Sequence, residues 1–153
     1  MKQSLRSALI ILCFYTASAF CAVEAKQDAE QKAMAVLDAF MTSFSASDPI
    51  AHTANYHFPH FRLANGEMQV WQTREDAIRD HKLIFPRLQD SGWHHSIWVE
   101  RKVIGVSDTK VHVATKFRRL REDGSEIVTA ESLYVLTLEQ GRWGVKLRSS
   151  YLR

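Results

Sequence analysis

The sequence contains few cysteines and little excess charge. Cys13 and Cys21 are its two thiols, and two thiols cannot build a disulfide framework or a large metal cluster. Lys and Arg number 20 against 17 Asp and Glu, and a net charge of +3 is weak evidence for a nucleic-acid partner. Hydrophobic residues make up 46% of the 153 residues, which excludes disordered and collagen-like proteins. Length and composition predict one globular domain with a substantial core.

The N-terminal segment has the pattern of an export signal. Lys2 and Arg6 give a positive start, an apolar run follows over residues 8–15, and Ala17 and Ala19 then stand in A-x-A spacing. These features in this order are typical of a Sec-type signal peptide. A membrane anchor would need about 20 apolar residues, and this run is shorter. We therefore expect a cleaved peptide, with no membrane anchor after processing.

Two cleavage points fit the pattern, one after Ala19 and one after Ala25. A cut after Ala25 removes both cysteines, so the folded part would have no thiol for disulfides, catalysis or zinc binding. We expect residues 1–25 to be the signal peptide and residues 26–153 to form a single domain. The expected location is the periplasm or the cell exterior.

Helices are predicted in the first half of the mature chain. Residues 27–46 carry apolar side chains at three- and four-residue spacing, which is typical of an amphipathic helix. Asp48 and Pro49 have the residue types of a helix cap and a first helical position, so a short second helix can begin there. Thr73 precedes two acids and begins a third helix, whose apolar stripe has His81 as its one polar member.

A hairpin is predicted between the second and third helices. Asn65-Gly66 is the strongest turn signal in the chain, because both residues accept positive φ. A two-residue loop places His60 opposite Trp71 and separates two faces of the hairpin. The expected core face is Phe61, Leu63, Met68 and Val70, and the expected polar face is His60, Arg62, Gln69 and Trp71.

Strands are predicted from Trp93 onward, where the apolar period falls towards two. The expected strands cover residues 94–106, 110–121, 126–138 and 142–152, with turn residues between them. Helices segregated on one face of an antiparallel sheet define an α+β domain.

This order of elements resembles the nuclear transport factor 2-like superfamily, in particular its bacterial polyketide-cyclase-like (SnoaL-like) members. The resemblance rests on the first amphipathic helix, on FPHFRLANGEMQVW followed by TREDAI, and on LYVLTLEQGRWGVKLRSSY, and it covers residues 27–152. It implies a cone in which a curved antiparallel sheet wraps against N-terminal helices around an apolar pocket, and frequent homodimers through the sheet. The superfamily includes isomerases, dehydratases, cyclases and proteins that only bind, so the resemblance implies a fold and no particular reaction.

The residues most suggestive of chemistry surround the hairpin. Tyr56, His57, His60 and Arg62 precede the turn, and Trp71 follows it. Imidazoles exchange protons near neutral pH, so a His beside Tyr and Arg could supply a base and an oxyanion donor for enolisation or dehydration. The alternative is a solvated or subunit-contacting face. The ketosteroid isomerase branch of the superfamily uses a carboxylate base with a Tyr and a protonated Asp, which this stretch does not match.

A metal site is not expected. His57 and His60, with His94 and His95, could supply imidazole ligands. Pro59 interrupts any helix that would align the first pair, and adjacent residues on a strand point to opposite faces. We predict neither a metal nor a cofactor.

Charged residues in the strands have two possible roles. The basic run of Lys116, Arg118, Arg119 and Arg121 could bind an anion, although alternation along a strand favours a solvated edge or salt bridges with Glu122, Glu126 and Glu131. No aromatic residues are interleaved with this run, so no nucleic acid is expected. Glu131 faces Lys116 if the Asp123-Gly124 turn is a two-residue loop, and Thr115 if that turn contains a bulge. Glu131 is then either a structural ion pair or, if buried, a base with a raised pKa.

We therefore expect an exported domain that binds a small apolar or aromatic molecule. The expected ligand contacts are Tyr56, His57, His60, Arg62 and Glu131, with Trp71 and Trp98 as walls. One alternative is an isomerase, dehydratase or cyclase with His57, His60 or Glu131 as its base. Another is a protein-interaction module with a filled core and an exposed apolar sheet face.

Overall fold

The computed structural model describes residues 4–152, with side chains for residues 23–152. Within this range the elements follow in the order α1 (Ser4–Ser45), α2 (Pro49–Thr53), β1 (Tyr56–Ala64), β2 (Glu67–Trp71), α3 (Arg74–Asp90), β3 (His95–Val106), β4 (Lys110–Leu120), β5 (Glu126–Glu139) and β6 (Arg142–Ser150). The predicted signal peptide falls almost entirely outside the described side chains, so its cleavage stays a prediction. In the part of the chain that the structure describes, no helix combines the length and apolar character that a membrane crossing requires.

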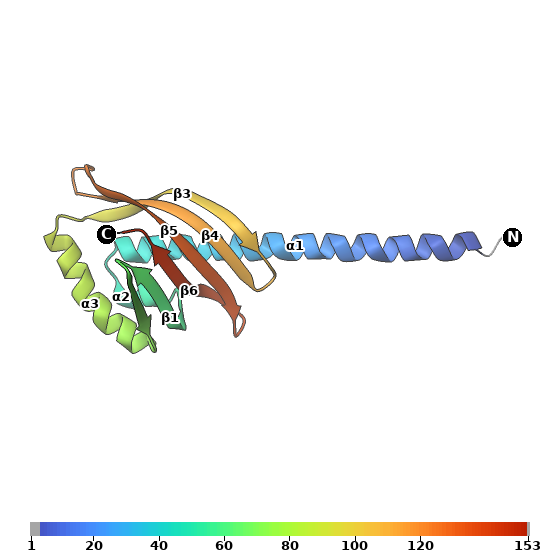
Figure 1. Cartoon of the computed structure of the whole chain (residues 1–153), viewed down its shortest axis with the longest axis horizontal. Coiled ribbons are helices and arrows are strands. Elements are labelled where there is room, and N and C mark those ends of the chain that lie inside the picture. Colours follow the sequence, from blue (N-terminus) through green and yellow to red (C-terminus); the bar gives the residue numbers. More distant parts are fainter. Residues whose placement is uncertain (1–3, 153) are drawn as a thin grey trace.

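The six strands form one curved sheet in the order β2-β1-β6-β5-β4-β3 (Figure 1). Strands β3 to β6 run as the predicted antiparallel meander, and β6 returns to lie beside β1. The β1–β6 pair is parallel, so the sheet is mixed, where the sequence led us to expect antiparallel pairs throughout. Register shifts interrupt four of the five pairs, and such bulges bend strands. The predicted α+β class, with a curved sheet against helices, is confirmed.

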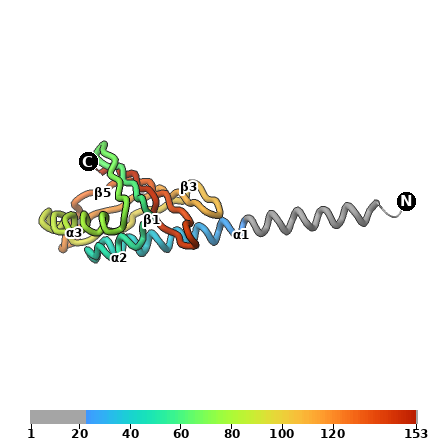
Figure 2. The backbone as a smooth tube through the Cα atoms, turned by 90° about the horizontal axis from the view of Figure 1, so that it is seen from below, coloured from blue at the N-terminus to red at the C-terminus, as the bar shows by residue number. Residues whose placement is uncertain are grey.

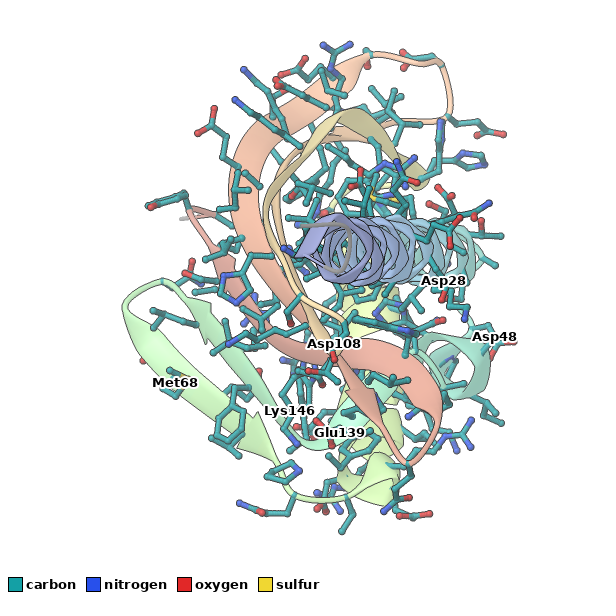
Figure 3. The ribbon with its side chains drawn as sticks, turned by 90° about the vertical axis from the view of Figure 1, so that its right-hand side faces the viewer. Asp28, Asp48, Met68, Asp108, Glu139 and Lys146 are labelled. Carbon is teal, nitrogen blue, oxygen red and sulfur yellow. The ribbon has the colours of Figure 1, made fainter. Side chains whose placement is uncertain are left out.

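The C-terminal half of helix α1 lies in the concave face of the sheet, as views from the side, from below and along its axis show (Figures 1, 2 and 3). Its buried hydrophobic residues recur every three or four positions, as predicted: Ala29, Ala33, Leu37, Phe40 and Phe44. The Trp98 ring packs edge-on against Tyr134, with ring centroids 5.7 Å apart, and its indole N–H donates to the Leu37 carbonyl at 3.2 Å. Trp98 is therefore part of the contact between α1 and the sheet.

Helices α2 and α3 begin where the sequence predicted. Asp48 accepts the Ile50 backbone N–H at 2.9 Å, and Thr73 accepts that of Asp76 at 3.1 Å. Helix α3 packs against α2 and β2. This packing buries His81 on the inner side of α3.

The β1–β2 hairpin has the predicted register, but the prediction of its two faces was wrong. Asn65 (φ 57°) and Gly66 (φ 77°) form the turn, and His60 pairs with Trp71. The expected core face lies on the convex side, where Met68 is 54% exposed and Leu63 is 37% exposed. Met68 accordingly lies far from α1 in Figure 3.

The expected polar face points inward because its polar atoms find partners there. His60 is 1% exposed and Trp71 is 3% exposed. The His60 Nδ1–H donates to the Val145 carbonyl at 2.9 Å, and the Trp71 indole N–H donates to Asp80 at 2.8 Å. Rings whose N–H groups are paired can be buried without loss of a hydrogen bond. The apolar face is left on the outside, where none of the three helices packs.

Candidate functional site

A cavity of about 280 Å³ lies between the concave sheet face and helices α2 and α3. Phe44 of α1, with Ile84 and Leu88 of α3, gives it an apolar side. Its other side combines imidazole, guanidinium, phenol and indole groups: His52, His60, His81, Arg62, Arg119, Arg148, Tyr56 and Trp71. Four of the seven predicted ligand contacts line this cavity, namely Tyr56, His60, Arg62 and Trp71.

The Tyr56 hydroxyl lies between two buried imidazoles. It is 2.9 Å from Nε2 of His52 and 3.3 Å from Nε2 of His81. Burial lowers the pKa of both histidines, and repulsion from His81 lowers the pKa of His52 further. Burial also raises the pKa of Tyr56 above its usual range. All three groups are therefore neutral near pH 7.

The triad can form a continuous chain of hydrogen bonds. His81 Nδ1 is 2.7 Å from the Ala77 carbonyl, which only accepts, so this Nδ1 carries the proton and Nε2 of His81 accepts. His52 Nδ1 is 3.2 Å from the Phe40 carbonyl and 3.3 Å from the Ser43 hydroxyl, so it can donate to the first or accept from the second. When it accepts, His52 Nε2–H donates to the Tyr56 hydroxyl, and that hydroxyl donates to His81 Nε2.

Three aromatic rings cluster around Tyr56. The His60 ring lies 3.9 Å from the Tyr56 ring at an interplanar angle of 11°, and the Trp71 ring lies 5.6 Å from His60 and 6.1 Å from Tyr56. Burial lowers the pKa of His60 to about 3, although its hydrogen bond to the Val145 carbonyl opposes the shift. His60 is thus a neutral, fixed ring in the lining of the cavity.

Three guanidinium groups line the same cavity without a counter-charge. Among side chains 23–152, Arg62, Arg119 and Arg148 form none of the salt bridges, and no Asp or Glu lines the cavity. The Nε atoms of Arg119 and Arg148 are buried without any hydrogen-bond partner. Burial, with repulsion from Arg148 and Arg62, lowers the pKa of Arg119 to about 10. The cavity is therefore strongly positive.

Strand geometry explains why two of these arginines point inward. Arg118 and Arg119 face opposite sides of β4, so Arg118 pairs with Glu126 at 3.0 Å on the outer surface while Arg119 enters the cavity. In β6 a register shift between Val145 and Leu147 reverses the alternation. Arg148 is therefore on the concave face, with its Cζ 5.6 Å from the Tyr134 ring.

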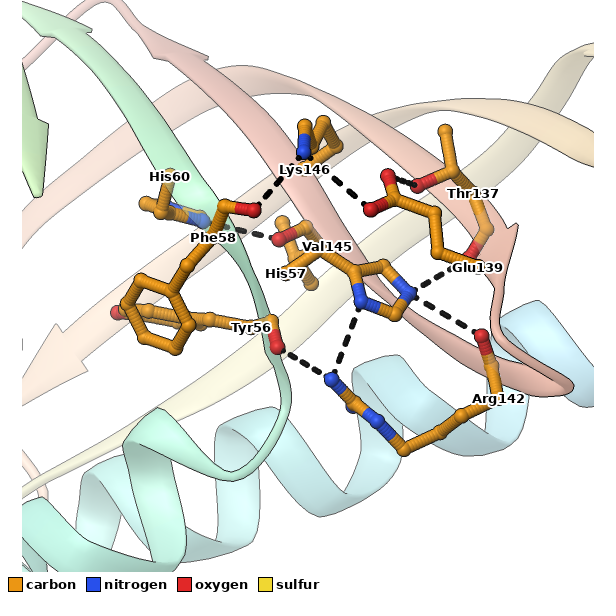
Figure 4. Close-up of polar contacts among 9 residues, drawn as sticks. All are labelled: Tyr56, His57, Phe58, His60, Thr137, Glu139, Arg142, Val145 and Lys146. Atoms are coloured by element: carbon orange, nitrogen blue, oxygen red, sulfur yellow. Dashed lines mark hydrogen bonds and ion pairs between the residues drawn. The ribbon is translucent and has the colours of Figure 1, made fainter. Parts of the chain in front are cut away.

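His57, a predicted catalytic candidate, lies outside the cavity and joins three strands (Figure 4). Its Nε2–H donates to the carbonyls of Thr137 at 3.0 Å and Arg142 at 3.1 Å. Its Nδ1 accepts from the Arg142 guanidinium at 3.1 Å, and that group also donates to the Tyr56 carbonyl at 2.7 Å. Both nitrogens are thus occupied in holding β1 to the β5–β6 hairpin.

Glu131 and Trp98 also lie away from the cavity. Glu131 is opposite Lys116 in the β4–β5 register, and their charged atoms are 3.9 Å apart on the convex face. This is the pairing predicted for a two-residue loop, although a register shift between Arg119 and Leu120 accompanies a longer turn. Glu131 is a surface ion pair, and Trp98 packs against α1.

The histidines and arginines of the cavity that were not among the predicted contacts are His52, His81, Arg119 and Arg148. His81 had a visible signal, because it is the one polar residue in the apolar stripe of α3. Arg119 had a weaker signal, because alternation along a strand turns one member of a basic run inward. Nothing in the sequence distinguishes His52, on the short helix α2, from a surface histidine.

The four histidines considered as metal ligands do not come together. The side chains described contain no group of three or more His, Cys, Asp or Glu residues arranged to hold a metal. His94 and His95 were expected on opposite faces, and this was wrong, because His94 precedes β3 and its Nδ1 lies 3.0 Å from that of His95.

Solved structures share this fold at low identity. An NTF2-like protein with a cystatin-like fold from Novosphingobium aromaticivorans gives a TM-score of 0.68 at 10% identity, over 99% of this chain and 90% of its own. An NTF-2 like protein of unknown function from Shewanella oneidensis gives 0.66 at 13% identity, over 80% and 98%. A ketosteroid isomerase-like protein from Erwinia carotovora atroseptica gives 0.59 at 17% identity, over 79% and 93%. These similarities show the fold alone.

The sequence itself matches one family. No curated protein matches the chain, but residues 29–147 match the model described as NTF2-like protein (DUF6841). This range contains every residue that lines the cavity except Arg148 and Leu152. The resemblance to the nuclear transport factor 2-like superfamily is thereby confirmed, and the chain belongs to the NTF2-like protein family DUF6841.

Proposed function

We propose that this chain is an exported protein that binds a small organic molecule in the cavity. The observation that carries the proposal is a hollow of about 280 Å³ that is lined by Arg62, Arg119 and Arg148 and has no Asp or Glu among its lining residues. Charged groups away from bulk water are normally paired, so this lining favours an occupant with hydrogen-bond acceptors. The hollow also argues against an interaction module with a filled core.

The lining favours a ligand with one aromatic ring, because Tyr56, His60 and Trp71 give the cavity an aromatic side. Small-molecule pockets commonly measure about 300–1,000 Å³, so this cavity of about 280 Å³ is just below that range and suits a small ligand. A ligand with an aromatic ring is also what the sequence led us to expect. The arginines in the lining add that the ligand should carry hydrogen-bond acceptors.

A thermal-shift screen of the purified full chain tests this proposal. We expect single-ring compounds to raise the melting temperature, and a cavity-filling Leu88→Trp variant to lose that response. Leu83→Trp is the matched control, because Leu83 lies on the same helix and is 57% exposed. The proposal fails if none of the compounds shifts the wild type, or if Leu88→Trp responds as the wild type does.

A second candidate function is proton-transfer catalysis of the isomerase or dehydratase type. The supporting observation is the Tyr56 hydroxyl between two imidazole nitrogens at 2.9 and 3.3 Å, an arrangement that can donate and recover a proton. The test is α-hydrogen exchange of cyclohexanone in D2O, followed by NMR. Tyr56→Phe should lower the rate by about 10²–10⁴-fold if the hydroxyl is the proton donor. A wild-type rate equal to that in buffer excludes this activity for the probe.

Export and dimerisation complete the proposal. The N-terminal sequence pattern supports a cleaved signal peptide, and mass spectrometry of protein from the periplasm should show a start at Phe20 or Lys26. The convex face carries exposed apolar residues, including Leu63, Met68 and Val70, which supports a second copy as the partner. Recovery of uncleaved protein from the cytoplasm alone would exclude export.

A further inference from the structure

We infer that the molecule bound in the cavity is a small organic acid, whose carboxylate is held by Arg62, Arg119 and Arg148. The inference rests on the proposed binding function and names the chemical class of the ligand. Three observations support it: the three guanidinium groups share one cavity, they have no acidic partner among the described side chains, and aromatic and apolar residues line the rest of the cavity.

Placement brings the charges together on the concave face. Arg62 and Arg148 are direct partners in the parallel β1–β6 pair, and neighbouring strands lie about 4.8 Å apart. Arg119 reaches the same cavity from β4. Like charges directly opposite one another destabilise a sheet. Three cations at one site therefore need an anion between them.

The three cavity arginines have no acidic partner among the described side chains, whereas basic residues on the outer surface of the same sheet do. Arg118, the neighbour of Arg119, pairs with Glu126 at 3.0 Å, and Lys116 pairs with Glu131 at 3.9 Å. Within side chains 23–152 the three cavity arginines have no such partner, and the cavity lining contains no carboxylate. Paired and unpaired basic residues thus occur on the same strand, β4, so the missing partners in the cavity do not reflect a general shortage of Asp and Glu.

Arg148 is positioned but not neutralised. Its Cζ lies 5.5 Å from the Phe117 ring and 5.6 Å from the Tyr134 ring. Contacts with ring faces orient a guanidinium and leave its positive charge in place. Its buried Nε is unpaired. The planar fork of an arginine matches the two oxygens of a carboxylate, which makes this acid group the best fit.

The rest of the cavity selects the body of the acid. His60 and Tyr56 provide an aromatic side, and Ile84 and Leu88 provide an apolar one. A volume of about 280 Å³ leaves room for one ring with its acid group. The structure thus favours a single-ring carboxylate over free phosphate or a long fatty acid.

Isothermal titration calorimetry of the purified full chain, at constant ionic strength, tests the inference. The probes are benzoate and cyclohexanecarboxylate, their neutral amides, phenylphosphonate and inorganic phosphate. We expect a carboxylate to bind at least tenfold more tightly than its amide. Arg148→Met and Arg119→Met should each weaken carboxylate binding at least tenfold, since a charge-assisted hydrogen bond contributes about 1.5–3 kcal/mol and 1.4 kcal/mol is tenfold. Arg118→Met is the matched control and should bind as the wild type does.

The outcomes separate the two proposals. Equal binding of acid and amide overturns the inference and leaves the binding function standing. Tighter binding of phenylphosphonate, or binding of inorganic phosphate alone, also overturns the carboxylate assignment. If none of the probes binds, both proposals fail. Thermal melts of each arginine variant show that it is folded, so that lost binding is assigned to the missing guanidinium.

Discussion

Replacing Arg119 with Met should stabilise the unliganded protein. The guanidinium is largely buried, its Nε has no partner, and two other arginines share its cavity. A buried unpaired donor costs about 1–3 kcal/mol. Repulsion from Arg148 and Arg62 adds to this cost and contributes to the lowered pKa of Arg119. The free energy of unfolding should rise by about 1–3 kcal/mol, because Met fills similar space without charge.

Urea unfolding at pH 7, followed by tryptophan fluorescence, measures this change. For a chain of this size the melting temperature should rise by about 2–4 °C for each kcal/mol. Arg118→Met is the control, because it removes an exposed ion pair with Glu126 and should change stability by less than about 1 kcal/mol. Destabilisation of Arg119→Met by 1 kcal/mol or more would refute the reasoning, since it would mean that the guanidinium has a stabilising partner.

Three further predictions follow from other parts of the structure. Burial keeps His52, His60 and His81 neutral by lowering their pKa, so the unfolded chain binds more protons below its ordinary histidine pKa. The free energy of unfolding should therefore fall as the pH is lowered from about 6.5 towards about 3, the folded pKa of His60. The fall should be up to about 1.4 kcal/mol per pH unit for each imidazole. Equal free energies of unfolding in urea at pH 7 and pH 5 would contradict this. Gly144→Ala should destabilise the protein by about 1–3 kcal/mol, because the new Cβ would lie 2.9 Å from the His57 ring. This ring is held in place by hydrogen bonds at both of its nitrogens. An unchanged melting temperature would show that the ring can move. Leu63→Glu should convert a dimer into a monomer in sedimentation velocity, whereas Leu83→Glu on α3 should not, and a wild-type monomer would exclude the convex interface.

Local rules predicted the elements and most of their pairings. Asn65-Gly66 defined the hairpin register, and the spacing of apolar residues located the helices and the meander. Which face of the hairpin is buried could not be predicted. The usual rule places apolar residues inside because buried polar groups are assumed to have no hydrogen-bond partners there. Val145 and Asp80 supply those partners from β6 and α3, which are distant in sequence.

The candidate site was predicted only in part, for a similar reason. Tyr56, His60, Arg62 and Trp71 lie close together in sequence and on one hairpin face, so they were found together. Arg148 reaches the cavity because a bulge shifts β6 by one residue, and a bulge has no reliable sequence signal. His57 was a reasonable candidate until its two nitrogens were seen to hold main-chain and guanidinium partners.

The most direct test of the central claim is a crystal structure of the full chain soaked with 4-bromobenzoate. The anomalous signal of bromine locates the ring independently of the protein. We predict the ring against His60 and Tyr56, with both carboxylate oxygens within hydrogen-bond distance of guanidinium nitrogens of Arg62, Arg119 or Arg148. A cavity filled by side chains, or bromine bound only outside it, would contradict the account.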